Sequence, residues 1–305
     1  MARSLFLFDM TFWLYLAALV LYVTYMLAKR PTMQLAPAGH PVEYSEGNDS
    51  GWAAQIGQVA TIVTVFGWVV NSLALFTRAY ERMQLSGTFA PWSNQFEAMS
   101  YVSWAIILGY VLLEFRYRIK AIGAFVVGIG FIAMGAASLL PYRYQTAEPL
   151  VPALNSYWIY IHVSVTLTSY AAFAMAGGLG VMYLLKERAE RRGKASSGLY
   201  ASFPDLETID ELGYKAIMVG FPLLAFGVIL GAMWANYAWG GYWSWDPKET
   251  WSLIVWLIYG AYIHARMTHG WEGRRAAIYA VFGFLMVIFC FWGVNFLLSG
   301  LHAYA

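Results

Sequence analysis

Residues 215–235 read KAIMVGFPLLAFGVILGAMWA, an almost unbroken apolar run that decides the class of fold. An α-helix needs about 20 mostly apolar residues to cross the hydrocarbon core of a bilayer. We expect eight such spans, over residues 10–28, 56–77, 97–115, 119–138, 158–185, 215–235, 248–267 and 276–298. The sequence therefore predicts an all-α integral membrane protein, a bundle of about eight transmembrane helices that forms one domain over residues 1–305.

The composition excludes an ordinary soluble domain. Of the 305 residues, 60% are hydrophobic and only 12% are charged, whereas soluble domains carry roughly 25% charged residues. The single cysteine, Cys290, can form no internal disulfide, and the chain contains no Cys-x-x-Cys pair. The sequence therefore excludes a thiol oxidoreductase and a c-type cytochrome.

The distribution of Lys and Arg predicts the orientation, because short cytoplasmic loops are enriched in these residues. If both termini lie outside, 14 of the 19 basic residues fall on the inner side. The five that remain outside are Arg3, Arg78, Arg82, Arg143 and Lys248. We therefore expect both termini on the outer, periplasmic or lumenal, face. Residues 186–214 are then a cytoplasmic loop, which begins as a charged helical extension.

A Trp-rich loop, residues 236–250, follows the span at 215–235. The run Trp239-Gly-Gly-Tyr-Trp-Ser-Trp-Asp-Pro-Lys-Glu-Thr-Trp-Ser-Leu253 carries four of the chain's 14 Trp. Indole rings bury a large area and stack on extended π-systems, and Gly240 and Gly241 allow the backbone a close approach. An interfacial aromatic belt explains scattered Trp, but not this density. We expect an outer binding surface for a large planar ligand, with a porphyrin as the candidate.

The acidic residues of this run match the start of a helix. Asp246 at the N-cap, Pro247 at the first helical position and Glu249 at the third resemble a capping box. A rigid start of this kind would fix the direction of the aromatic side chains Trp239, Tyr242, Trp243 and Trp245. The two carboxylates therefore have a structural explanation that is compatible with ligand binding.

Three histidines are candidate iron ligands, since imidazole is a frequent axial ligand of haem. His162 lies just inside the outer end of the fifth span and His302 follows the eighth, so both are expected beside the Trp-rich loop, on opposite sides of one iron. The alternative for each is an interfacial histidine bonded to a carbonyl or water. His264 lies 17 residues beyond Pro247, about 25 Å along the helix axis. It is expected to bind a second, inner haem, unless it merely snorkels to the cytoplasmic end.

The other outer loop, expected between the second and third spans, carries Arg78 and Arg82, followed by Pro91-Trp-Ser-Asn-Gln-Phe-Glu97. A guanidinium pairs bidentately with a carboxylate. Arginines on the outer face, Arg78 among them, are therefore candidates for contact with haem propionates.

The segment Trp239-Gly-x-x-Trp-x-Trp-Asp246 resembles the tryptophan-rich WWD signature of haem-handling membrane proteins. Its extension to Trp251, together with His162, Tyr262-Ile-His-Ala-Arg266 and Gly300-Leu-His302, resembles the CcsA/ResC cytochrome c biogenesis proteins of System II. Pro91, Asn94 and Glu97 are similar to that family's outer loop. The resemblance covers most of the chain and is most specific from about residue 90 onward.

This resemblance implies a membrane subunit of the System II cytochrome c synthase, a haem lyase active with a CcsB/Ccs1 (ResB-like) partner. It implies that haem b crosses the membrane and is attached at the outer face to Cys-x-x-Cys-His of apocytochrome c, without a side-chain nucleophile from this chain. The implied iron ligands are His162 and His302 outside, and His264, with a partner histidine, within the membrane. The expected cofactor contacts are Trp239, Gly240, Tyr242, Trp243, Trp245, Asp246, Glu249, Trp251, Arg78, Asn94 and Glu97. The implied location is a bacterial plasma membrane or a thylakoid membrane.

Two alternatives remain open. A haem exporter could load a haem chaperone without ligation, as six-span CcmC-type proteins with the same signature do, although eight spans and the Asp-Pro-Lys-Glu segment argue against it. A transporter subunit that binds no haem, with a simple Trp belt, is the alternative from another class.

Overall fold

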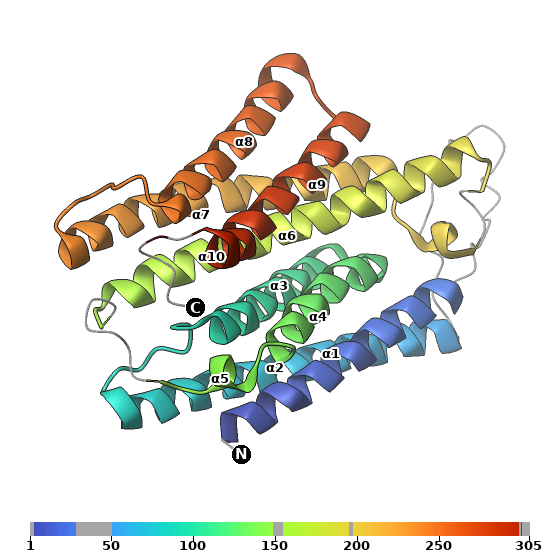
Figure 1. The fold of residues 1–305 in the computed structure, drawn as a ribbon. Helices are drawn as coiled ribbons and strands as arrows, with labels where there is room; N and C mark the ends of the chain where they lie inside the picture. Colours follow the sequence, from blue (N-terminus) through green and yellow to red (C-terminus); the bar gives the residue numbers. More distant parts are fainter. Residues whose placement is uncertain (1–2, 29–50, 149–154, 195–197, 299, 301–305) are drawn as a thin grey trace.

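The computed structural model describes residues 3–28, 51–148, 155–194, 198–298 and 300, and every regular element in them is helical (Figure 1). The elements are α1 (Arg3–Ala28), α2 (Trp52–Ser86), α3 (Gln95–Tyr117), η1 (Lys120–Ile122), α4 (Gly123–Ser138), α5 (Tyr142–Gln145), α6 (Trp158–Arg191), η3 (Gly198–Ser202), α7 (Leu206–Trp239), α8 (Pro247–His269), α9 (Arg274–Ile288), the π-helical turn η4 (Phe289–Gly293) and α10 (Val294–Leu297).

Seven helices of the described residues are long and apolar enough to cross a membrane, which confirms the all-α membrane fold. They are α1, α2, α3, η1 with α4, α6, α7, and α9 continued through η4 and α10. The remaining predicted span, 248–267, lies in α8, which has 23 residues but is not among the seven. Its Trp, Tyr, Ser and Thr side chains make it less apolar than the others.

The helices form two groups that meet along α6 (Figure 1). Helices α1 to α4 pack on one another, and α6, α7, α8 and α9 form the second group. Helices α3 and α4 contact α6 and so join the groups. Aromatic packing is prominent in the second group, where the rings of Phe173 and Tyr259 are stacked with centroids 3.7 Å apart.

Glycines bring α6 and α7 into close contact. A Cβ at Gly220 would lie 2.8 Å from the ring of Phe173, and one at Gly227 would lie 2.6 Å from Oγ1 of Thr166. Small residues of this kind let helix backbones approach each other in lipid. The spacing of α6 and α7 therefore depends on the absence of side chains at these positions.

The helices run further than the apolar spans predict. Helix α6 continues to Arg191, which confirms the charged helical extension, and Arg191 pairs there with Glu187 at 2.7 Å. Helix α2 continues to Ser86, so the expectation that Arg78 and Arg82 lie in a loop is wrong. Both arginines are in the last turns of α2, and their burial is possible because each finds an acidic partner or carbonyl inside the protein.

The start of α8 confirms the predicted capping box. Asp246 accepts a hydrogen bond from the backbone N–H of Lys248 at 3.0 Å, and Glu249 accepts one from the backbone N–H of Asp246 at 3.2 Å. Pro247 occupies the first turn. The helix therefore begins rigidly at the end of the bundle where α7 stops, which we call the Trp end.

Candidate functional site

A cavity at the Trp end brings together side chains from distant parts of the sequence. His162 of α6 lies in its wall, with Trp239 and Trp243 of the Trp-rich loop, Glu249 of α8 and Asn94 from the segment before α3. Five of the residues expected to contact haem therefore line one cavity. Its remaining lining is largely apolar and comes from the segment before α3 and from α3, α6, α7, α8, η4 and α10.

His162 is held in a defined orientation by α7. Its Nδ1 lies 2.8 Å from the carbonyl oxygen of Gly227, and its ring meets that of Trp234 edge-on at 5.7 Å. A carbonyl oxygen only accepts hydrogen bonds, so in the neutral imidazole Nδ1 carries the proton and Nε2 the lone pair. Metal-binding histidines commonly donate their other ring N–H to a carbonyl in this way.

The Trp-rich loop turns sharply after α7. Gly240 adopts φ 79°, and its N–H caps the helix by donating to the carbonyl of Asn236 at 3.0 Å. This left-handed conformation suits glycine and ends the helix directly after Trp239. Tyr242 and Trp245 are 62% and 70% exposed and lie outside the cavity lining. The loop thus divides its aromatic side chains between the cavity and the surface.

The carboxylates of the loop organise its backbone. Oε2 of Glu249 accepts hydrogen bonds from the N–H groups of Ser244, at 2.8 Å, and Asp246. Asp246 is buried, and a Cβ at Gly300 would lie 2.4 Å from its Oδ2. The chain two residues before His302 therefore lies against the start of α8, while His302 itself is outside the described residues.

Trp251 and His264 lie away from this cavity. Trp251 packs against Phe289, with ring centroids 4.4 Å apart, and is partly buried against the core of the second helix group. His264 is exposed on α8, with its ring 5.9 Å from that of His269. The structure does not bring His264 together with His162.

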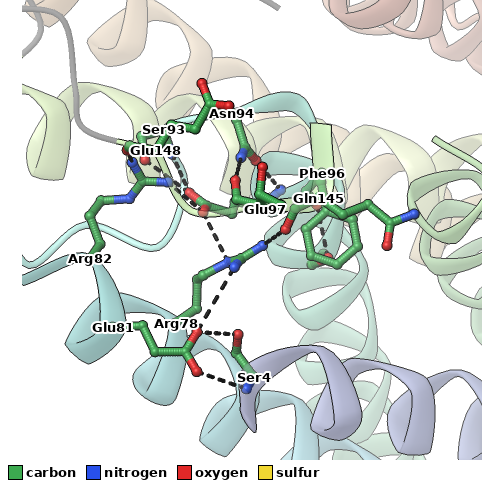
Figure 2. A network of polar contacts seen from close by, with 12 residues as sticks. Ser4, Arg78, Glu81, Arg82, Ser93, Asn94, Phe96, Glu97, Gln145 and Glu148 are labelled. Carbon is green, nitrogen blue, oxygen red and sulfur yellow. Dashed lines mark hydrogen bonds and ion pairs between the residues drawn. The ribbon is translucent and has the colours of Figure 1, made fainter. Parts of the chain in front are cut away.

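Arg78 and Glu97 form a buried ionic cluster with Arg82 rather than part of the cavity wall (Figure 2). Oε1 of Glu97 lies 3.1 Å from Nε of Arg78 and 2.6 Å from Nη2 of Arg82, and all three side chains are at most 2% exposed. Both guanidinium groups also donate to backbone carbonyls, those of Gln145 and Glu148.

The cluster nevertheless reaches the edge of the cavity through Glu97. Its Oε2 accepts hydrogen bonds from the backbone N–H and the Oγ of Ser93, both at 2.9 Å. Asn94 caps α3 by accepting from the N–H of Glu97 at 2.9 Å. Ser93 and Asn94 both line the cavity, so the ionic cluster fixes one of its walls.

Several polar residues of the cavity were missed by the sequence analysis. Lys248, Gln95 and Asn295 line it together, and Lys248 and Gln95 stand within runs quoted above without having been singled out. Three buried polar atoms of the lining make no hydrogen bond to the described residues, and they are Nε2 of Gln95, Oγ1 of Thr166 and Nε1 of Trp234. Buried polar groups normally have partners, so these atoms indicate a cavity that receives a partly polar ligand or water.

Comparison with known proteins places the chain in a family. A family model described as "Cytochrome C assembly protein" matches residues 92–302. The cytochrome c biogenesis protein CcsA of Guillardia theta is 42% identical over 256 residues, which cover 79% of this chain and 83% of the relative. The protein of the same name from Porphyra purpurea is 36% identical over 284 residues, covering 82% of this chain and 88% of the relative.

A solved structure, that of the cytochrome c haem lyase CcmF, has a similar fold. The two superpose with a TM-score of 0.61 at 18% sequence identity. The match covers 97% of this chain and 46% of that chain. At this identity the likeness concerns the arrangement of helices alone.

Proposed function

This chain belongs to the CcsA family of cytochrome c biogenesis proteins, and we propose that it is the membrane subunit of a cytochrome c synthase. Family membership gives an integral membrane protein with a role in cytochrome c assembly. The proposal adds that the chain carries haem b across a plasma or thylakoid membrane and holds it at the Trp end. There the haem is attached to the Cys-x-x-Cys-His segment of apocytochrome c.

The position of His162 carries this proposal. Its Nδ1 is engaged by the carbonyl of Gly227, so its Nε2 has the lone pair that an iron requires. Trp239 and Trp243 line the same cavity and offer aromatic surface for a porphyrin face. An axial imidazole beside aromatic walls is the arrangement expected of a haem pocket.

We propose His302 as the second axial ligand. The supporting observation is that Gly300 lies against Asp246 and Pro247 at the start of α8. The chain from Gly300 to His302 is short enough to keep the histidine near the Trp end, since each residue spans at most about 3.6 Å.

The reaction requires no nucleophile from this chain. Each apocytochrome thiol adds across one haem vinyl group, so that sulfur bonds to one vinyl carbon and the thiol hydrogen to the other. No group leaves, and this addition involves no net oxidation. The chain supplies orientation and a high effective concentration of the reacting groups.

The exposed position of His264 supports a partner subunit at α8. A polar imidazole that faces lipid is unfavourable, and ionisable residues within a membrane usually have a partner. We propose that a CcsB/Ccs1-type (ResB-like) subunit covers this face of α8 and supplies a second histidine to a transmembrane haem.

The proposal is tested by the absorption of the complex purified from haem-replete cells. The wild-type complex should show the Soret band of bis-histidine haem. In His162→Gly, the part of the Soret absorption that comes from haem in the cavity should disappear or shift. Added imidazole should restore it by occupying the position that the His162 side chain has left. His269→Gly, at the exposed end of α8 and outside the cavity lining, is the control. A colourless wild-type complex would refute haem binding.

A further inference from the structure

Lys248 is a cation inside the cavity. Its Nζ donates to Oδ1 of Asn295 at 2.5 Å and to the carbonyl oxygen of Phe291 at 3.4 Å. Both partners come from the end of the chain that contains the π-helical turn η4, and π-helical turns are frequent at functional sites. Lys248, Phe291 and Asn295 all line the cavity.

The lysine sets the direction of a short hydrogen-bond relay. An ammonium can only donate, so Asn295 must present its oxygen to Lys248 and its amide nitrogen to the next group. Nδ2 of Asn295 donates to Oε1 of Gln95 at 2.8 Å. Gln95 must therefore present its own NH2 group, which is buried and has no partner among the described residues. Gln95 is 6% exposed and lines the cavity.

The charge of Lys248 has no close counter-ion in the described part of the chain, where none of the ion pairs involves it. The nearby carboxylate of Glu249 is occupied by the N–H groups of Ser244 and Asp246. Asp246 attracts Lys248 without forming an ion pair with it, and the carboxylate of Asp246 caps α8. A half-buried ammonium without a counter-ion is costly, and an anionic ligand would remove this cost.

We propose that Lys248 and the NH2 group of Gln95, aligned through Asn295, form a subsite for a carboxylate. This inference rests on the proposed function, which makes haem the ligand of the cavity, and the occupant is then a haem propionate. The subsite would hold the polar edge of the haem, and His162, which lines the same cavity, would supply the iron ligand. Lys248, rather than Arg78, is the cation that selects a ligand with carboxylates.

The test compares haem with haem dimethyl ester, which has the same ring and iron but no free carboxylate. The full chain in complex with its partner, purified from haem-depleted cells, is titrated with each compound and followed by the Soret band. All proteins carry His264→Ala, so that the cavity is the site observed. The wild-type cavity should bind haem about ten- to a hundredfold more tightly than the ester.

Three variants decide the assignment. Lys248→Met should lower the affinity for haem to that for the ester and leave the ester's affinity unchanged. Gln95→Leu keeps the lysine and should also reduce the preference for haem over the ester. It therefore tests the carboxylate subsite if Lys248→Met does not fold. Lys215→Met, at an exposed lysine paired with Glu211, is the control and should keep the full preference.

Results that contradict the carboxylate subsite can be distinguished from a result that contradicts the proposed function. Equal affinity of the wild-type cavity for haem and ester would overturn the subsite and leave the proposed function standing. An equal loss of both affinities in Lys248→Met and Gln95→Leu would overturn it too, because it would show a structural role. A wild-type complex that binds neither compound would refute the proposed function itself.

Discussion

The imidazole of His162 lies against Gly231, where an added Cβ would stand 2.7 Å from Cε1 of the ring. One turn earlier on α7, Gly227 provides the carbonyl that accepts from Nδ1. Two glycines of one helix face therefore determine the place of the ring, one through a hydrogen bond and the other through the space it leaves.

Gly231→Ala should displace the imidazole of His162 and lower haem occupancy of the cavity several-fold, with a shifted Soret band. The added Cβ would meet the imidazole ring of His162, so the ring must move. The substitution should therefore affect iron ligation by His162 more than the stability of the protein. Gly260→Ala on α8 is the control, because a Cβ there would meet Phe221 at an ordinary 3.4 Å. An unchanged spectrum in Gly231→Ala would show that the ring position in the structure does not matter for haem binding.

Glu97→Gln should destabilise the protein strongly. It leaves the guanidinium groups of Arg78 and Arg82 buried without their shared carboxylate, and removing one partner of a buried ion pair typically costs about 3–5 kcal/mol. The thermal unfolding midpoint in detergent measures the effect. Glu211→Gln breaks the exposed pair with Lys215 and should leave the midpoint unchanged, since exposed pairs contribute little. Equal midpoints for the two variants would contradict the structural role of the cluster.

Local signals in the sequence predicted the helices and the Trp end well. The capping box of Asp246, Pro247 and Glu249 is encoded by three residue types at fixed spacing, so it could be read without any tertiary contact. Trp239 and Trp243 line one cavity, in agreement with the binding surface expected from the same short run. Such features depend on neighbours in sequence.

Features that depend on distant contacts could not be predicted in this way. An arginine next to an apolar span can bind a ligand or form an ion pair with a carboxylate inside the protein. Only the packing of α2 on α3 shows that Arg78 pairs with Glu97. The relay from Lys248 through Asn295 to Gln95 joins three separate parts of the chain. No periodicity or motif spacing relates these positions.

Asp246→Ala should remove the N-cap of α8, at a cost of about 1 kcal/mol, and should also weaken haem binding. The second effect is expected because this cap stabilises the first turn of α8, from which Glu249 holds the backbone N–H of Ser244 in the loop that carries Trp243. Asp205→Ala provides a close match, since Asp205 caps α7 by accepting from the N–H of Thr208 at 2.7 Å. It should cost similar stability without a change in the Soret band. A similar loss of haem in both variants would mean that helix capping in general, and not the loop, controls occupancy.

His264→Ala should reduce the haem that co-purifies with the complex while the cavity at the Trp end still accepts added haem. The reason is distance, because 17 residues of α8 separate His264 from Pro247, about 25 Å along the axis. One iron cannot reach both His264 and His162, so under the proposed function the two histidines belong to independent sites. His269→Ala is the control for the neighbouring imidazole, whose ring lies 5.9 Å from that of His264, and it should leave haem content unchanged. Pyridine haemochrome quantification gives haem per complex. If His264→Ala retains the full wild-type content, the membrane haem is not bound at this position, and the exposed face of α8 requires another explanation.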